Sequence, residues 1–450
     1  MAVLKARRVD TYAARRDRLA QQLQGATGQV TLRKKNSNLF RDRDRASKPR
    51  LDVHDFNHVL QVDPRSGWAD AEGMTAYETL VLSTLACGTM PAVVPQLKTI
   101  TLGGAVAGVG IEASSFRQGL VHQGVLEMDI LAGDGKVYLC SPQNEHSDLF
   151  FGFPNSYGTL GYALRVRIKT MPVRKFVRIE HSRFDDASAY FRGLHALCES
   201  AADFVDGVVF GPDELYLTAA TFVDEAPLVS DYTFEHIYYR SIRERDTDYL
   251  SVHDFLWRWD TDWFWCSKNF GAQNPLIRRL AGKARLNSRT YTSIMRWNSR
   301  WRLTQRFGAL FGVQRESVIQ DVDIPIERAA EFLEFFRREV GILPIWICPI
   351  RSPDARAFPL YPLNPATTYV NFGFWDVVKS NKSQLPGHFN RLIERKVAQL
   401  GGIKSLYSDS YFSRQEFDAI YGAQAYRELK SRYDPHNRLH DLYDKCVLRR

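Results

Sequence analysis

Alternation between apolar and polar residues predicts several short strands in the first third of the chain. Two such runs, 58–62 and 68–73, flank a turn. A second pair flanks the Gly-Asp-Gly turn at 133–135, which is typical of a hairpin, and a further strand is expected within 158–173. The pattern predicts strands that pair through tight turns.

Helical periodicity predicts one helix between these strands and another at the N-terminus. Over 75–88 the apolar positions recur at helical spacing, Gly88 supplies a stop, and Thr75 with Glu78 forms a capping box. Residues 1–27 are basic and amphipathic and lack the apolar core of a secretory signal. We expect them to form a basic surface helix.

A different order of elements begins near Phe176. Strand and helix patterns there form a β-α-β-β unit, and a related helix–strand–strand–helix set follows later in the chain. Together they predict a ferredoxin-like α+β cap interrupted by an insert. The elements are a strand (176–184), a helix (185–201) and two strands (204–210, 215–222), then a helix (326–341), two strands (343–350, 367–375) and a helix at about 388–400.

The segment 101–115 concentrates four glycines in eight residues and contains G-x-G-x-x-A. In a Rossmann domain this motif opens a helix after a strand and precedes a parallel strand. Here a poor helix and a hairpin follow it, so a Rossmann fold is not expected. Glycines allow a backbone to approach a diphosphate closely, and consecutive N–H groups form an anion-binding nest. A purely structural glycine turn remains the alternative.

Composition limits the class of protein. With 450 residues, 44% hydrophobic and 25% charged, the chain has enough apolar residues for two or three folded domains. No apolar run reaches the length of a membrane span. Six cysteines without a C-x-x-C pair argue against a disulfide framework and favour the cytoplasm.

The net charge of +9 is concentrated in one insert, 255–315. From Trp263 to Arg315 there is no acidic residue, and tryptophans cluster in and just before this stretch. Basic side chains together with tryptophan rings suit an anionic membrane interface. They suit nucleic acid less well, because no nucleic-acid-binding module is found elsewhere in the sequence. A basic surface over an aromatic core is the remaining interpretation. The six tryptophans are Trp257, Trp259, Trp263, Trp265, Trp297 and Trp301.

Several motifs in order resemble the FAD-binding family of vanillyl-alcohol oxidase and p-cresol methylhydroxylase. They are Thr101-Leu102-Gly103-Gly104, the cluster 108–115, the strand pair 129–137, Gly158-Thr159-Leu160-Gly161 with Pro172, and the closing turn 434–437. Within that family, "NEHSDLFFGFPNSYGTLGY", "LPIWICP" and "LYSDSYFSRQEF" are similar to delta-24-sterol reductases and to bacterial flavin reductases that convert methylene-branched acyl chains to methyl-branched ones.

The resemblance implies a domain division and a fold. The fold class is α+β, with a PCMH-type FAD-binding domain and a ferredoxin-like cap that holds the substrate. The expected divisions are a basic N-terminal helix (1–27), the FAD-binding domain (28–175), the cap (176–420) with its insert (255–315), and a C-terminal segment that returns to the FAD domain (421–450).

The same resemblance implies non-covalent FAD, since no His or Cys for flavin attachment is evident, with NADPH as the electron donor. The family's first diphosphate loop corresponds to "TLRKKNSNLFRDR", which departs from the glycine-rich pattern and offers Asn36, Ser37 and Asn38 as donors. The expected cofactor-binding residues are Asn38, Thr101, Gly103, Gly104, Gly108, Gly110, Ile111, Glu112, Ser114, Ser115, Gly158, Thr159 and Gly161.

Reduction of an isolated alkene requires a proton donor as well as a hydride, because no carbonyl polarises the double bond. A carboxyl or phenol in an apolar pocket can serve, and aromatic faces stabilise the developing cation. Glu112 is one candidate, with a bracing role in its loop as the alternative. Tyr407, Asp409 and Tyr411 are others, expected on one face of an extended segment. Trp346 and Cys348 share a face and suit a core equally well.

The sequence thus predicts an FAD-dependent, NADPH-driven reductase of a lipid C=C bond, most closely a 10-methylene to 10-methyl acyl reductase. A sterol side-chain reductase, a flavin alcohol oxidase or dehydrogenase, and a binding protein without activity remain as alternatives. A lipid methyltransferase is the expected functional partner, and a cytoplasmic location with peripheral attachment to the inner membrane face is expected. The pairs His54/His58 and His436/His440 lack the glutamate of a metalloprotease motif, so no metal is predicted.

Overall fold

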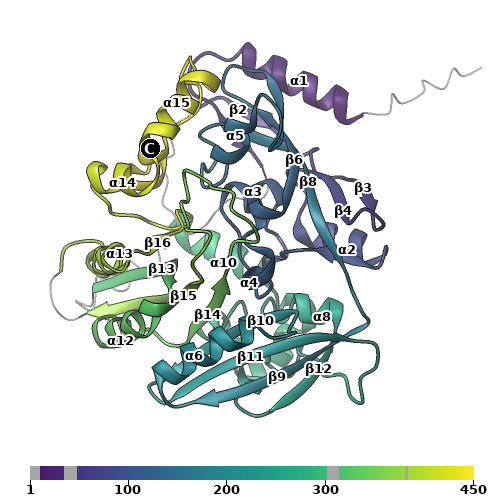
Figure 1. Ribbon diagram of the computed structural model, residues 1–450, viewed down its shortest axis with the longest axis vertical. Coiled ribbons are helices and arrows are strands. Elements are labelled where there is room, and N and C mark those ends of the chain that lie inside the picture. The colour runs from purple at the N-terminus through teal and green to yellow at the C-terminus, as the bar shows by residue number, and fades with distance from the viewer. Residues whose placement is uncertain (1–10, 35–47, 302–313, 381–383) are drawn as a thin grey trace, which may run out of the picture.

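A computed structural model describes residues 11–34, 48–301, 314–380 and 384–450, which fold around two antiparallel sheets (Figure 1). The first sheet has the strand order β3-β4-β8-β6-β7, and β5 also pairs with β8. It contains the predicted strands 58–62 and 68–73 and the predicted hairpin, which are confirmed. Its strands are β3 (Val59–Asp63), β4 (Trp68–Glu72), β5 (Thr89–Pro91), β6 (Val125–Leu131), β7 (Val137–Cys140) and β8 (Tyr162–Pro172).

The helix predicted at 75–88 is present as α2 (Tyr77–Leu85), but its capping box is wrong. The N-cap residue is Ala76, which makes no side-chain cap. Thr75 lies one residue too early, and its Oγ1 donates to the carbonyl of His58 at 3.1 Å, at the edge of β3. A tertiary hydrogen bond has therefore replaced the local cap.

The glycine segment is more ordered than a simple nest. Thr101 caps a short helix, α3 (Leu102–Ala107), by accepting from the N–H of Gly104 at 3.3 Å. A turn follows in which Val109, a non-glycine residue, has φ +51°, and α4 (Ser115–Gln118) comes next. Of the hairpin strands, β6 pairs antiparallel with both β7 and β8, which confirms that this segment does not begin a Rossmann unit.

The second sheet joins the two predicted cap units edge to edge. Its order is β12-β9-β11-β10-β14-β15-β13-β16, all antiparallel, with β10 and β14 as the junction. β13, which pairs with β15 along twelve residues, is absent from the sequence prediction. The strands are β9 (Phe176–Phe184), β10 (Phe204–Gly211), β11 (Glu214–Val223), β12 (Thr247–Ser251), β13 (Gln314–Pro325), β14 (Ile345–Ile350), β15 (Tyr369–Ser380) and β16 (Ile403–Lys404).

Three helices cover the outer face of this sheet: α6 (Ala187–Cys198), α12 (Ala329–Glu339) and α13 (His388–Gln399) (Figure 1). Phe191, Phe332 and Ile393 from these helices share one buried core with alternate residues of β10, β13 and β15. The opposite face of the sheet is turned toward the first domain. The predicted α+β fold is confirmed, and this inner face forms one wall of the candidate site.

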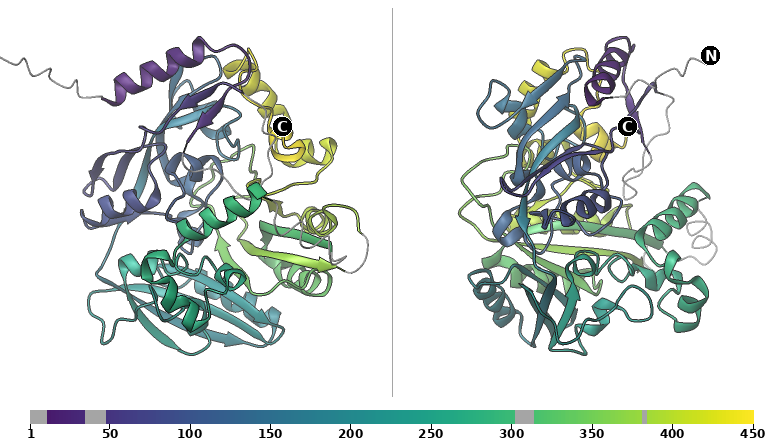
Figure 2. Two further views of the ribbon diagram at one scale, coloured as in Figure 1. Left: turned by 180° about the vertical axis from the view of Figure 1, so that it is seen from behind. Right: turned by 90° about the vertical axis from the view of Figure 1, so that its right-hand side faces the viewer.

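The basic insert is largely an aromatic core. Trp257, Trp259, Trp263 and Trp265 are buried, so they are not displayed for a membrane or a nucleic acid. Trp297 and Trp301 have side chains outside the described part. The helices in and next to the insert are α8 (Val252–Leu256), α9 (Pro275–Ala281) and α10 (Ser288–Trp301). In the left view of Figure 2, α10 lies on the side that faces the viewer. Within the described ranges, no helix is both long and apolar enough to cross a membrane.

The two ends of the chain meet on the first domain. α1 (Tyr12–Gln24) buries Leu19 and Leu23 there, next to a small parallel pair, β1 (Thr31–Arg33) with β2 (Arg50–Asp52). The C-terminal segment carries α14 (Arg414–Ile420) and α15 (Ala423–Tyr433). From it, the carbonyl of Tyr433 accepts from the N–H of Asp134 at 3.0 Å in the β6–β7 turn.

Short 3-10 turns and two single-turn helices complete the described structure. They are η1 (Val121–Gly124), α5 (Ser147–Gly152), α7 (Tyr238–Ser241), η2 (Cys266–Phe270), η3 (Lys283–Arg285), η4 (Ile326–Arg328) and a π-helical turn, η5 (Asp444–Leu448).

Candidate active site

A cavity of about 1640 Å³ lies between the glycine segment and the inner face of the second sheet. This exceeds the roughly 300–1,000 Å³ of ordinary small-molecule pockets. The volume therefore suits a large cofactor together with a second ligand. Thr292 and Ile294 of α10 also line it.

Most of the predicted cofactor residues line this cavity. The structure brings these residues together from two segments, 101–112 and 158–161, that lie about 50 residues apart in the chain. A methyl group on Gly103 would lie 2.9 Å from the carbonyl of Gly73, and one on Gly108 would lie 2.9 Å from that of Gly104. These contacts explain why glycine stands at both positions. The lining residues of the set are Thr101, Gly103, Gly104, Gly108, Gly110, Ile111, Glu112, Gly158 and Gly161.

Three predicted residues use their hydroxyls within the protein and do not line the cavity. Ser114 Oγ donates to the carbonyl of Ala92 at 2.7 Å, and Thr159 Oγ1 to that of Ser156 at 2.8 Å. Ser115 Oγ accepts from the N–H of Glu112 at 3.1 Å. These side chains brace the loops that carry the glycines. Asn38 lies outside the described residues.

The donor set of the cavity fits a dinucleotide such as FAD. Within the described part of the chain, the N–H groups of Val109 and Ile111 make no hydrogen bond, and both residues line the cavity. Such N–H groups bind anionic oxygens. Basic side chains from both ends of the chain line the cavity as well, and they are suited to phosphate charge. They are Lys34, Lys48, Lys445, Arg449 and Arg450.

Glu112 is the centre of a buried ion network. Its Oε1 accepts from Arg258 Nη2 at 3.1 Å and from Gln96 Nε2, and the same Nη2 reaches Asp206 Oδ2 at 2.8 Å. Oε2 of Glu112 is buried without a partner in the described structure. Burial raises the pKa of Glu112 to about 7, since one guanidinium offsets two carboxylates only in part. Both sequence interpretations of Glu112, acid and brace, find support in this arrangement.

β13 presents a row of alternate side chains to the cavity that the sequence prediction missed. Arg315, Ser317, Ile319, Asp321 and Asp323 line it, while the residues between them face the helices. Burial raises the pKa of Asp321 to about 7 and that of Asp323 to about 6. The alternation in "RESVIQDVDIP" was the available signal.

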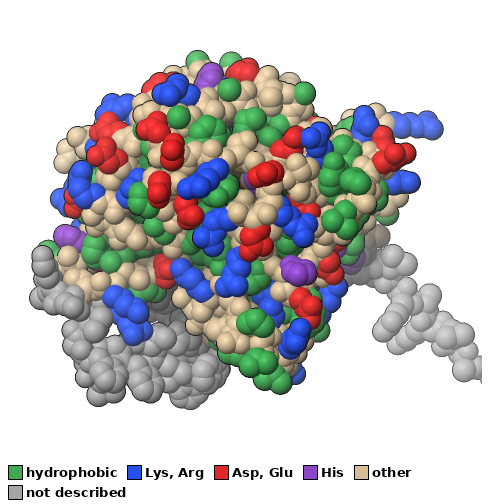
Figure 3. Space-filling model, turned by 90° about the horizontal axis from the view of Figure 1, so that it is seen from below, with side chains coloured by type: hydrophobic (Ala, Val, Ile, Leu, Met, Phe, Trp, Pro, Cys, Tyr) green, Lys and Arg blue, Asp and Glu red, His purple; other side chains and the backbone are tan. Residues whose placement is uncertain are grey.

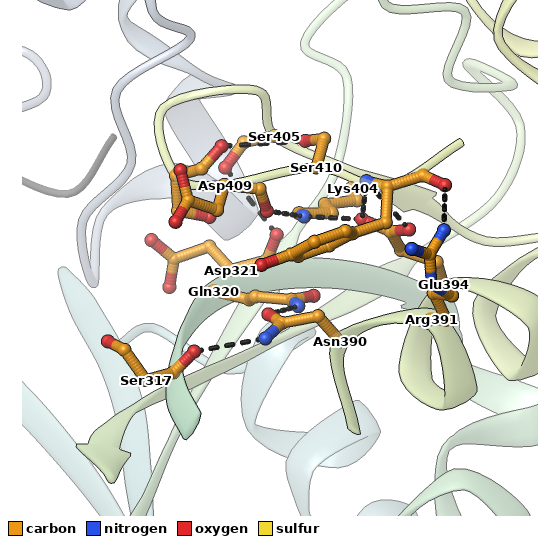
Figure 4. A network of polar contacts seen from close by, with 12 residues as sticks. Ser317, Gln320, Asp321, Asn390, Arg391, Glu394, Lys404, Ser405, Asp409 and Ser410 are labelled. Atoms are coloured by element: carbon orange, nitrogen blue, oxygen red, sulfur yellow. Dashed lines mark hydrogen bonds and ion pairs between the residues drawn. The ribbon is translucent and has the colours of Figure 1, made fainter. Parts of the chain in front are cut away.

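Asp321 and Asp323 differ in their partners. Asp323 Oδ1 accepts from Asn371 Nδ2 and its Oδ2 from the hydroxyl of Tyr361, both at 2.7 Å. Asp321 is hydrogen-bonded to Tyr407, and its Oδ1 is buried without a partner in the described structure. Figure 4 shows Asp321 beside the loop that carries Ser405 and Asp409.

The predicted common face of Tyr407, Asp409 and Tyr411 is only partly formed. Tyr407 and Asp409 line the cavity. Tyr411 does not. Its ring instead packs over Gly387 and beside Arg391, where the ring centroid is 4.9 Å from the guanidinium carbon.

Aromatic side chains form the remaining wall. The ring centroids of Phe264 and Trp375 are 4.6 Å apart, and those of Phe264 and Trp346 are 5.5 Å apart. Trp346 also donates from Nε1 to Asp206 at 3.3 Å. Cys348, predicted on the same face, does not line the cavity, and its Sγ donates to the carbonyl of Glu112 at 3.2 Å. The wall suits a hydrocarbon ligand.

The structure places neither histidine pair in a metal site. His58 Nδ1 lies 2.6 Å from Glu72, which Arg15 also contacts, and His54 Nδ1 lies 2.5 Å from Asp52. In the described ranges, no cluster of three His, Cys, Asp or Glu side chains could hold a metal ion.

Comparison with known proteins identifies the class of the first domain. A family model described as an FAD binding domain matches residues 18–141, which contain the glycine segment and the β6–β7 hairpin. The cavity-lining glycines of that segment therefore belong to an FAD-binding domain, and the α+β architecture agrees with it.

Longer similarity extends over both domains. The chain is 27% identical over 410 residues to Delta(24)-sterol reductase of Homo sapiens, covering 86% of this chain and 75% of that protein. The Pisum sativum protein of the same name is 24% identical over 344 residues, covering 68% and 57%. Cytokinin dehydrogenase 7 of Oryza sativa subsp. japonica is 31% identical over 147 residues, 32% of this chain and 28% of that protein. These similarities indicate an FAD-binding oxidoreductase.

Proposed function

We propose that the protein is an FAD-dependent, NADPH-driven reductase of an isolated lipid C=C bond. One observation carries this proposal: a single cavity joins the glycine segment of an FAD-binding domain to an aromatic wall and to carboxyl groups of raised pKa. The FAD is held non-covalently. We propose that NADPH uses the same cavity in turn.

Each part of the cavity has a task in such a reaction. When bound, FAD supplies the hydride. The glycine turns and basic side chains hold its diphosphate, and Phe264, Trp346 and Trp375 exclude water from the alkene. Their faces also favour positive charge on the more substituted carbon, by about 0.5–2 kcal/mol per well-placed ring. A carboxyl or phenol of the cavity supplies the proton.

We propose a methylene-branched fatty acyl chain, converted from 10-methylene to 10-methyl, as the substrate. The similarity of the motifs to reductases of such chains supports this choice, and the aromatic wall suits any branched hydrocarbon. A sterol with a Δ24 double bond is the alternative, favoured by the length of the match to proteins of that name. A lipid methyltransferase that forms the methylene group would then act one step earlier.

The test is expression with a methylene-forming lipid methyltransferase in a host that lacks both activities. Mass analysis of extracted lipids is expected to show the methylene-branched chain gaining two hydrogens. The matched control omits the reductase. Purified protein with NADPH and a Δ24 sterol tests the alternative, and conversion of the sterol but not the acyl chain would replace our substrate assignment.

An oxidase or dehydrogenase of alcohols or amines is a second candidate, since the chain is 31% identical over 147 residues to a cytokinin dehydrogenase. The two functions differ in what reduces the flavin. We expect anaerobic bleaching of the flavin by NADPH. Bleaching by an alcohol or amine, with rapid reoxidation by oxygen, would favour the oxidase.

We also propose a cytoplasmic enzyme that docks on anionic membrane through α9. Trp257, Trp259, Trp263 and Trp265 of the insert are buried, but α9 exposes three apolar side chains, Leu276, Ile277 and Leu280, which are 71%, 45% and 83% exposed. Arg279 and Lys283 lie beside them and are mostly exposed, in surface ion pairs with Glu235 at 3.4 Å and Asp231 at 3.9 Å. This combination suits acidic headgroups. The face seen in Figure 3 mixes basic and acidic side chains without a patch of one sign.

Vesicle sedimentation tests this docking. The protein is expected to bind phosphatidylglycerol vesicles in low salt and to be released by high salt. Leu276→Glu with Leu280→Glu should abolish binding, whereas Leu228→Glu, at a side chain 64% exposed elsewhere, should not. Equal binding by all three proteins would contradict the assignment to α9.

A further inference from the structure

The mechanism above leaves the proton donor unassigned, and β13 offers a carboxyl group that no sequence motif indicates. Asp321 projects from the cavity face of the strand directly across from Gly373 of β15. A methyl group on Gly373 would lie 2.8 Å from Asp321 Oδ1 and 2.6 Å from the Trp375 ring. Glycine at this position therefore lets the carboxyl and the indole lie side by side in the cavity wall.

Tyr407 connects these two groups. Its hydroxyl accepts from Trp375 Nε1 at 2.9 Å and is hydrogen-bonded to the Asp321 carboxyl. The loop is held in place by the backbone, since the N–H of Ser405 donates to the carbonyl of Asp321 at 3.1 Å. Trp375, Tyr407 and Asp321 all line the cavity. The phenol thus has a hydrogen-bond donor on one side and an acid on the other.

Resting on the proposed function, we propose that Tyr407 is the catalytic acid that protonates the alkene and that Asp321 is the positioning residue that returns a proton to it. Neither the domain model nor the relatives assign either role. The pair stands against the aromatic wall, where a hydrocarbon chain would bind. It is distinct from the Glu112 network on the glycine side.

The proton and electron balance is complete. The π electrons of the alkene form a C–H bond at the less substituted carbon with the Tyr407 hydroxyl proton. The hydride completes the C–H bond at the other carbon, so the alkene is reduced and NADPH is oxidised overall. The Tyr407 oxygen, left negative, takes the proton of neutral Asp321 and is stabilised meanwhile by Trp375 Nε1–H. Asp321 then takes a proton from water.

The charges near Asp321 favour its neutral form. Burial raises its pKa, the Tyr407 hydrogen bond opposes this in part, and the charge of Asp323 on the same strand adds to it. The nearby cations are engaged elsewhere: Lys404 pairs with Glu394 at 2.7 Å, and Arg449 lies 3.5 Å from Asp409. Burial also raises the pKa of Tyr407 well above the usual value, so the phenol stays protonated until the alkene is bound, and its phenolate readily takes the proton of Asp321.

Glu112 is the competing acid, and its environment is less suited to the task. Its Oε1 is contacted by Arg258 and Gln96, which both stabilise the carboxylate. The guanidinium therefore opposes the neutral, proton-donating form of Glu112. Asp321 has no such cation among its described contacts.

The experiment separates the two half-reactions in the flavin-loaded enzyme. For Asp321→Asn and Tyr407→Phe, flavin binding and anaerobic bleaching by NADPH should be unchanged. Reoxidation of the reduced flavin by a phospholipid carrying a methylene-branched chain should slow about 10²-fold or more, the usual contribution of a general acid. Glu316→Gln, on the other face of β13, is the matched control and should behave as wild type.

The pH profile supplies the second measurement. In wild type, the rate of alkene reduction should fall above about pH 7 as Asp321 loses its proton, and Asp321→Asn should lack this limb. An infrared carboxyl band of a neutral acid, present at pH 6 and smaller in Asp321→Asn, would report the proton without turnover.

The outcomes distinguish the two proposals. If wild type is bleached by NADPH but not reoxidised by the lipid, the proposed function fails. If wild type is active while Tyr407→Phe or Asp321→Asn reduces the alkene within about twofold of the wild-type rate and keeps the fall in rate above pH 7, the assignment of the proton-delivery pair is wrong. Loss of the limb in Glu112→Gln alone would transfer the role to Glu112. Should Asp321→Asn fail to fold, two measurements decide: the rate of alkene reduction by Tyr407→Phe and the pH titration of the infrared carboxyl band in wild type.

Discussion

Arg258 Nη2 lies 3.1 Å from Glu112 Oε1, which joins two residues 146 positions apart in the chain. Glu112 belongs to the glycine segment of the FAD-binding domain, and Arg258 to the insert of the cap. Because Asp206 of β10 shares the same guanidinium, one buried cation ties the cofactor loop to the sheet that bears the rest of the cavity. The relative position of the two walls therefore depends on this contact.

Arg258→Met should be strongly destabilising, because it leaves two carboxylates buried without a cation. Removing one member of such a buried network costs about 3–5 kcal/mol in the free energy of unfolding. Arg174→Met is the matched control: its pair with Asp224 has a similar N–O distance, 2.7 Å, but is exposed. That change should cost at most about 1 kcal/mol. Urea unfolding measures both, and equal effects would contradict a structural role for burial here.

The raised pKa of Glu112 predicts how stability depends on pH. The carboxyl takes its proton at about pH 7 when folded and near pH 4.5 when unfolded, so the folded state binds more protons between these values. Its contribution is complete below pH 4.5 and is lost as the pH rises through 7. The Glu112→Gln variant lacks this pH-dependent contribution to the free energy of unfolding, which is on the order of 3 kcal/mol.

The measurement is the free energy of unfolding of both proteins from pH 4 to 8. Wild type should lose stability relative to Glu112→Gln across this window. Asp321 and Asp323 contribute in the same direction, which is why the difference between the two proteins, rather than the wild-type curve, is compared. A constant difference at all pH values would show that folding does not shift the pKa of Glu112.

The first domain was predictable because its signals are local. The turn at 133–135 and the alternation over 58–73 determine strand pairing between neighbours in sequence. The two β-α-β-β-like units of the cap were predictable for the same reason. β13 was missed because it comes directly after the acid-free insert, and because its cavity face carries Asp321 and Asp323 where a buried strand would be expected to carry apolar residues.

The site was predictable only where it rests on one segment. The glycine segment identified the cofactor loop, but Arg258 and Asp321 reach the cavity from distant parts of the chain and have no periodicity that marks them. Tyr411 was placed wrongly, since its ring packs on Gly387 and Arg391, which the local alternation does not indicate. The insert tryptophans were ambiguous in the sequence, because Trp265, for example, packs on Trp375 of a distant strand.

Gly103→Ala should weaken FAD binding. The added methyl group would meet the carbonyl of Gly73 at 2.9 Å and the side chain of Ala163 at 3.3 Å, so the start of α3 must move. We expect at least a tenfold rise in the dissociation constant, about 1.4 kcal/mol. Gly124→Ala, where nothing lies within 4 Å, should bind as wild type. Flavin fluorescence titration of the apoprotein measures both, and unchanged affinity for Gly103→Ala would remove this glycine from the cofactor site.

Trp375→Phe tests whether the indole serves the reaction through its hydrogen bond or only through its ring. The variant keeps an aromatic face beside Phe264 but loses the donor to the Tyr407 hydroxyl. Without that donor the phenolate is less stable, so alkene reduction should slow by about three- to tenfold, the value of one hydrogen bond, while bleaching by NADPH is unchanged. Trp265→Phe is the matched control, because this indole also packs on Trp375, at 5.8 Å, yet its Nε1 has no partner in the described structure. Stopped-flow measurement of both half-reactions decides: equal slowing in the two variants would mean that packing, and not the Trp375 hydrogen bond, sets the rate.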